Sequence, residues 1–151
     1  MKLKKLTAIA ATSALIVSCI APTGVLANNY SDTAWTFSIA TGGNAYASEG
    51  REKQDSTSAY MKCNTMTHNG GTTGSGNSYY GTAYGSTSLN GTYSNCMYNG
   101  KTSTRYLFTS GTVKYMTNYI KESNHSFARI WCESGYTSYA TFTGVWSPDS
   151  I

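Results

Sequence analysis

Glycine and asparagine divide this chain into short segments of alternating side chains, and this division constrains its fold more than any other feature. Asn90-Gly91 and Asn99-Gly100 are dipeptides that two-residue hairpin turns prefer, because both residue types accept a positive φ. Between the turns, apolar and small or polar residues alternate, as at Trp35, Phe37 and Ile39. A period of two residues is typical of a strand with one buried face.

About eight such segments follow one another, and no long segment has the period of a helix. Segment 118–124 is the least strand-like and is expected to form one helical turn or a crossover. The pattern predicts a single all-β domain over residues 28–151, folded as an antiparallel β-sandwich of about eight short strands. The expected strands are residues 33–40, 57–67, 79–88, 92–98, 102–110, 112–117, 127–132 and 137–145.

Residues 1–27 have the order of a secretory signal peptide. Three lysines among the first five residues precede an uncharged segment from Leu6 to about Ile20, and Val25 and Ala27 fit a signal-peptidase site. The apolar run is shorter than the roughly 20 residues of a membrane span. We therefore expect cleavage after Ala27, a secreted domain, and no transmembrane span in the mature chain.

A lipoprotein signal is the alternative interpretation of the same segment. Ile16-Val17-Ser18-Cys19 matches a lipobox, in which Cys19 would be lipidated and would anchor the chain to a membrane. However, the eight residues after Cys19 continue the apolar leader, whereas a polar tether is usual after a lipid anchor. Secretion is the preferred interpretation.

The leader also carries most of the positive charge. The whole chain has a net charge of +4, but the eight Lys and Arg residues after residue 27 face seven Asp and Glu residues. A nearly neutral domain has no basic field that would attract nucleic acid or an acidic membrane surface. We expect no nucleic-acid partner.

An odd number of cysteines remains after the leader: Cys63, Cys96 and Cys132. In an exported chain this number favours one disulfide plus one thiol that is free or available for self-association. The sequence leaves open whether Cys63 pairs with Cys132 or with Cys96, and whether Cys96 pairs with Cys132. The alternative is that all three are small buried side chains that are never oxidised.

Few residues could carry catalysis. His68 and His125 are the two histidines, and a pair such as Cys132 with His125 is the arrangement that a hydrolase would need. Histidines beside Asn and Ser in turns are usually solvated loop residues. Glu122 and Glu133 are conceivable as glycosidase carboxylates, although no motif pairs them.

No metal or cofactor motif is recognised. The spacings of cysteine and histidine ligands that hold zinc do not occur, and the glycine-rich loop at residues 70–76 lacks the ending of a phosphate loop. Glu49, Glu52 and Asp55 could bind a hard cation, but Arg51 and Lys53 lie between them. A solvated charge patch is the preferred interpretation, and we expect no cofactor.

Tyrosine is the strongest functional lead. All 13 tyrosines lie at or after residue 30, and several fall on segments expected to be neighbouring strands. An exposed tyrosine face would suit a protein partner or a sugar, since tyrosine supplies rigid contact area and a hydroxyl. The alternative is that these rings fill a leucine-poor core. The residues of this predicted binding surface are Tyr79, Tyr80, Tyr84, Tyr93 and Tyr98.

Three stretches carry a resemblance to known proteins. They are residues 32–37 (DTAWTF), residues 51–53 (REK) with 57–62 (TSAYMK), and the terminal residues 144–151 (GVWSPDSI). Together they resemble small secreted β-rich proteins of unknown function from Gram-positive bacteria. The resemblance implies an extracellular β-rich domain and no catalytic residues. Bacteriocins of the lactococcin type have a similar general plan, but their motifs do not match.

These observations favour a secreted, non-enzymatic protein that binds a cell-wall polymer, a surface protein or a second copy of itself. A bacteriocin-like antagonistic protein is the first alternative, on the basis of size and export. An extracellular hydrolase that uses His125 or Cys132 is the second.

Overall fold

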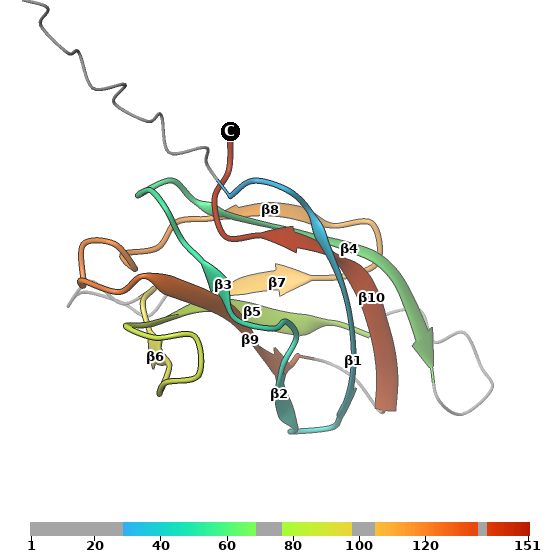
Figure 1. The fold of residues 1–151 in the computed structure, drawn as a ribbon. Helices are drawn as coiled ribbons and strands as arrows, with labels where there is room; N and C mark the ends of the chain where they lie inside the picture. The colour runs from blue at the N-terminus through green and yellow to red at the C-terminus, as the bar shows by residue number, and fades with distance from the viewer. Residues whose placement is uncertain (1–28, 69–76, 98–104, 136–138) are drawn as a thin grey trace, which may run out of the picture.

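The structure is a computed structural model that describes residues 29–68, 77–97, 105–135 and 139–151. Within these residues it contains ten strands and no helix, and the strands form two sheets that pack face to face (Figure 1). The expected antiparallel β-sandwich is therefore confirmed. The described residues contain no apolar helix of membrane-spanning length. The predicted leader, its cleavage site at Ala27 and the alternative anchor at Cys19 lie outside the described residues.

The first sheet, sheet A, has four antiparallel strands in the order β1-β10-β4-β8. Phe37 and Phe142 face each other across β1 and β10, and the register of β10 against β4 shifts between Thr143 and Gly144. The strands are β1 (Thr33–Ala40), β10 (Tyr139–Ser147), β4 (Ala59–His68) and β8 (Val113–Met116).

The second sheet, sheet B, has six strands and a main order of β2-β9-β5-β6, with β3 paired to β9 and β7 paired to β5. All its pairings are antiparallel. The strands are β2 (Asn44–Tyr46), β9 (Phe127–Ser134), β5 (Tyr79–Ser86), β6 (Ser94–Asn95), β3 (Arg51–Glu52) and β7 (Tyr106–Phe108).

Aromatic rings fill the space between the sheets, because the chain offers few leucines for this purpose. Phe37 and Phe142 stack with centroids 5.4 Å apart, and Tyr79 stacks on Phe108 at 5.0 Å. Tyr79 also meets Phe142 edge-on at 4.8 Å, which joins the two sheets. Such pairs stabilise a core beyond the area that they bury.

Gly144 permits a close approach of three strands at the register shift in sheet A. A Cβ atom there would collide with the carbonyl oxygen of Lys62 on β4 and with the ring of Trp35 on β1. The absence of a side chain leaves room for the Trp35 ring beside Gly144. A bulge at such a position is a structural requirement of the fold.

The charged segment after β2 is the predicted solvated patch only in part, since Glu49 and Glu52 are exposed and Lys53 is not. Lys53 is fully buried, and its Nζ atom donates hydrogen bonds to Thr57 O and Pro148 O, both at 2.7 Å, and to Asp149 Oδ1 at 2.9 Å. Asp149 also accepts a hydrogen bond from the N–H of Gln54. This buried ion pair fastens the end of the chain to the loop after β3, beside the start of β1 (Figure 1).

Candidate functional site

Strand β5 sends its tyrosines to opposite sides of sheet B. Tyr79 and Ala83 are fully buried and point into the sandwich, whereas Tyr80 and Tyr84 are half-buried on the outer face. This alternation follows from the pleat of a strand, in which neighbouring side chains lie on opposite faces. The outer face of sheet B is therefore the place to examine for the predicted tyrosine surface.

One member of the predicted surface belongs to the core, a second is buried, and a third is not described. Tyr79 is a core residue, so its assignment to a surface is wrong, and the alternative that rings fill a leucine-poor core holds at this position. Tyr93 is buried as well, with its hydroxyl donating a hydrogen bond to Leu89 O at 2.9 Å. Tyr98 lies outside the described residues.

Tyr84 and the buried Tyr93 join a group that we call the aromatic cluster: Tyr46, Tyr84, Tyr93, Trp131 and Arg129. Tyr46 is at its centre, with ring centroids 4.7 Å from Trp131, 6.1 Å from Tyr84 and 6.2 Å from Tyr93. The rings of Tyr84 and Trp131 are 5.8 Å apart. Three strands contribute, since β9 lies between β2 and β5. Tyr46, Tyr84 and Trp131 remain partly exposed, with Tyr93 buried beneath them.

Arg129 places a positive charge against the rings of the cluster. Its guanidinium carbon lies 4.0 Å from the centroid of Tyr46 and 5.4 Å from that of Tyr93, which are distances of cation–π contact. Its Nε atom donates a hydrogen bond to Ser48 O at 3.0 Å, which fixes the planar group over the rings. Among the described residues, the ion pairs do not use Arg129.

A cleft of about 400 Å³ opens beside the aromatic cluster. Its walls include Tyr93 and Arg129 from the cluster, and Glu49 and Asn90 from two loops. The cleft thus combines a carboxylate, an amide and a guanidinium, which together donate and accept hydrogen bonds. Gly50 forms part of the wall, where a Cβ atom would collide with the Tyr93 hydroxyl.

A second cation–π pair lies on another part of sheet B. The Arg105 guanidinium carbon is 4.1 Å from the ring centroid of Tyr80, and Arg105 also forms an exposed ion pair of 3.0 Å with Glu133. Tyr80 is therefore on the outer face, as predicted for the tyrosine surface. An exposed ion pair contributes little to stability, so this pair chiefly holds the Tyr80 ring in place.

The three cysteines are buried free thiols, and no disulfide is formed among the described residues. Cys63 and Cys132 are fully inaccessible and Cys96 is 3 % exposed, so none presents a thiol at the surface. Burial raises the pKa of Cys63 to about 11 and raises the pKa of Cys132 well above its usual value. The predicted disulfide is not found in this structure, in which the three side chains act as small apolar residues of the core.

In the structure His125 contacts Cys96, and not Cys132 as in the pair considered from the sequence. His125 Nδ1 lies 3.3 Å from the sulfur of Cys96, whereas Cys132 is in the core. Gly85 makes room for this contact, since a Cβ atom there would lie 2.6 Å from His125 Nδ1. Burial raises the pKa of Cys96, which keeps it a neutral thiol and opposes a nucleophilic role. His68 lies apart, with Nδ1 3.1 Å from Tyr139 O.

The carboxylates do not assemble into a metal or glycosidase centre. Within the described residues, no group of three or more His, Cys, Asp or Glu side chains could hold a metal ion. Asp55 instead accepts hydrogen bonds from the N–H and hydroxyl of Thr57. Glu133 lies six residues into β9, about 20 Å along the strand from its start, whereas Glu122 precedes that start. A glycosidase pair needs a separation of about 5–10 Å.

Three residues of the aromatic cluster were missed by sequence reasoning: Tyr46, Arg129 and Trp131. The signal for two of them was present, because Arg129 and Trp131 alternate with the buried Ala128 and Ile130 along β9. Tyr46 offered no such signal, since β2 is three residues long and follows a turn.

Comparison with known proteins gives a family without an assigned activity. The sequence model of one family, described as proteins of unknown function (DUF2712), matches residues 23–150. No curated protein matches the chain, and neither does any solved structure. The match supports the resemblance to proteins of unknown function, whereas an extracellular setting in Gram-positive bacteria stays a prediction.

Proposed function

This chain belongs to the DUF2712 family, and we propose that it is an extracellular, non-enzymatic binding protein that holds a neutral glycan of the cell surface. The observation that carries the proposal is the aromatic cluster. Tyr46, Tyr84 and Trp131 keep part of their rings exposed around a fixed arginine on the outer face of a sheet.

The chemistry of the site fits a sugar. A sugar ring presents C–H groups on its faces and hydroxyl groups around its edge. Aromatic rings cover the apolar faces, and Arg129, Glu49 and Asn90 in the adjoining cleft can donate to or accept from the hydroxyls.

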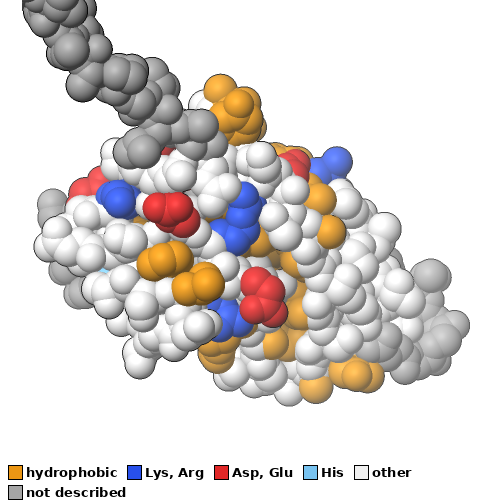
Figure 2. All heavy atoms as spheres, in the orientation of Figure 1, with side chains coloured by type: hydrophobic (Ala, Val, Ile, Leu, Met, Phe, Trp, Pro, Cys, Tyr) orange, Lys and Arg blue, Asp and Glu red, His pale blue; other side chains and the backbone are white. Residues whose placement is uncertain are grey.

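The charge distribution favours a neutral ligand over a charged polymer. On the face shown in Figure 2, basic and acidic side chains lie singly and intermixed, so neither sign forms a field. A polyanion would be attracted by a continuous basic patch. The leader predicted over residues 1–27 supports a ligand outside the cell, for which a wall polysaccharide is the simplest candidate.

The proposal is tested by sedimentation of the exported protein with insoluble cell-wall polysaccharide stripped of protein. We expect the protein to pellet with the polymer, and Trp131→Ala to weaken binding about tenfold because the ring is central to the site. Tyr139→Ala is the matched control, since Tyr139 is a half-exposed ring on sheet A.

Thermal unfolding followed by circular dichroism checks that each variant folds. The proposal fails if the protein stays in the supernatant. It also fails if a folded Trp131→Ala variant binds as tightly as the unaltered chain does.

A further inference from the structure

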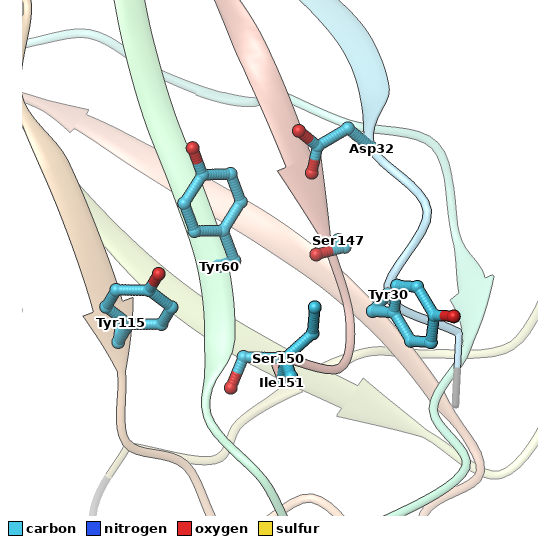
Figure 3. A pocket seen from close by; sticks show the side chains of 7 residues that line it. All are labelled: Tyr30, Asp32, Tyr60, Tyr115, Ser147, Ser150 and Ile151. Atoms are coloured by element: carbon cyan, nitrogen blue, oxygen red, sulfur yellow. The ribbon is translucent and has the colours of Figure 1, made fainter. Parts of the chain in front are cut away.

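A second cavity, of about 390 Å³, lies at the end of the molecule where the described chain begins and ends (Figure 3). Tyr60 and Tyr115 reach it from neighbouring strands, and Tyr30 and Asp32 reach it from the segment before β1. We call this cavity the end pocket. It lies against the outer face of sheet A, whereas the aromatic cluster lies on the outer face of sheet B.

Three tyrosine rings line the end pocket. Tyr60 and Tyr115 are partners across β4 and β8, with ring centroids 5.5 Å apart. Tyr30 is placed on the other side of the pocket in Figure 3. Tyr30 and Tyr115 are 51 % and 59 % exposed, so their rings contribute little to the core.

Asp32 adds a negative charge to this group of rings. Burial raises the pKa of Tyr60, and the nearby charge of Asp32 raises it further, which places the carboxylate close to the ring. The ion pairs found among the described residues do not use Asp32. Arg51 donates hydrogen bonds to Ser31 O and Asn29 Oδ1, and although burial lowers the pKa of its guanidinium, the charge of Asp32 is among those that raise it.

We propose that the end pocket binds a quaternary ammonium group, such as that of choline. The faces of tyrosine rings carry negative potential and attract an organic cation, and a carboxylate adds a full negative charge. A methylated ammonium has no N–H to donate, so it needs no ring of hydrogen-bond acceptors. The end pocket supplies this combination through Tyr30, Tyr60, Tyr115 and Asp32.

The test is a titration of the exported protein with choline chloride, in which isothermal titration calorimetry measures the affinity. The neutral isostere 3,3-dimethyl-1-butanol has the same shape with carbon in place of nitrogen, and ethanolamine carries a primary ammonium. We expect choline to bind at least about tenfold more tightly than the isostere and more tightly than ethanolamine.

Two variants locate the binding. Asp32→Asn keeps the shape and removes the charge, and we expect choline binding to weaken about fivefold. Tyr115→Ala removes one exposed ring, with an expected loss of about two- to fivefold. Tyr139→Ala, an exposed ring outside the end pocket on the same sheet, should bind choline as the unaltered chain does.

The possible results of these experiments either support or overturn the proposal, and a vesicle assay identifies the source of the choline group. Equal affinity for choline and its neutral isostere, tighter binding of ethanolamine, or unchanged binding in both folded pocket variants would overturn the proposal. Sedimentation with phosphatidylcholine vesicles would assign the choline to a lipid headgroup. Choline binding without such sedimentation would assign it to a soluble or polymer-linked source. The glycan assay uses a different site and has no bearing on this result.

Discussion

Tyr79 and Tyr80 are neighbours in the sequence and have opposite environments. Tyr79 packs against Phe108 and Phe142 between the sheets, whereas Tyr80 lies on the outer face under Arg105. The pleat dictates that one of them points inward, but the sequence does not say which one, because both are tyrosine. This ambiguity explains why the predicted tyrosine surface contained one core residue.

The aromatic core leads to a prediction at Tyr79. Its hydroxyl is buried and makes no hydrogen bond of normal geometry among the described residues, with only the Cys63 thiol, a weak partner, beside it. Tyr79→Phe should therefore change the free energy of unfolding by less than about 1 kcal/mol, because at most a weak contact to a thiol is lost. Tyr79→Ala should reduce it by about 3–5 kcal/mol through the cavity that it leaves. Urea denaturation measures both, and a large loss in Tyr79→Phe would contradict the assignment.

Asp149 leads to a prediction about acid stability. Burial alone would raise its pKa, but hydrogen bonds from Lys53 and from the N–H of Gln54, with the charge of Lys53, hold the pKa below its usual value. A carboxyl group with a lowered pKa in the folded state stabilises the fold above its unfolded pKa of about 4. That stability is lost as the pH falls through the lower, folded pKa.

Asp149→Asn should therefore flatten the dependence of stability on pH below about pH 4. It should also cost about 3 kcal/mol at neutral pH, since it removes the closer of the two carboxylates that pair with the buried Lys53 and leaves only Asp55 at 3.9 Å. Urea denaturation from pH 2 to pH 7 is the measurement. An unchanged dependence of stability on pH in the variant would show that protonation of Asp149 does not cause the loss of stability in acid.

At the scale of elements, alternation identifies strands and does not identify their partners. β7 and β8 follow each other closely, so a hairpin is the simplest expectation, yet β7 pairs with β5 in sheet B and β8 with β4 in sheet A. The short strands β2 and β3 were not predicted, because they lie in a polar, charged segment at the edge of sheet B. Their pairing with β9 comes from the tertiary fold and not from local propensity.

The prediction at the scale of elements concerns the stability of a variant at Gly144. Gly144→Ala should reduce the free energy of unfolding by about 1–3 kcal/mol, because its Cβ atom has no room beside Lys62 O and the Trp35 ring. Gly42→Asn is the matched control: its φ of 71° suits asparagine, and its Cβ position has no neighbour within 4 Å. Equal stability of the two variants in chemical denaturation would contradict the close approach of β1, β10 and β4.

At the scale of the whole molecule, the division of the chain into short alternating segments was the most informative feature of the sequence. Short alternating segments and turn dipeptides predicted an antiparallel sandwich, and the structure confirms it. The aromatic cluster was predictable only in part. Tyr84 and Tyr93 were found, but the cluster forms only when β9 is inserted between β2 and β5, which is a long-range pairing.

The mass of the exported protein tests the predicted leader and the state of the thiols together. We expect a mass that corresponds to residues 28–151 with three reduced cysteines. An alkylating reagent should modify Cys63, Cys96 and Cys132 only after denaturation, since all three are buried. A lipid on Cys19, or a mass 2 Da lower from a disulfide (two hydrogens lost), would contradict these expectations.

The central claim is that the aromatic cluster binds a glycan, and the fluorescence of Trp131 reports directly on that site. Of the three tryptophans, Trp35 and Trp146 are 4 % and 1 % exposed, and only Trp131 lies in the cluster. Soluble fragments of wall polysaccharide should therefore change the tryptophan emission in a saturable way, and Trp131→Phe should abolish that change. Unaltered emission during a titration in which the fragments bind, or the same change in Trp131→Phe, would contradict the claim.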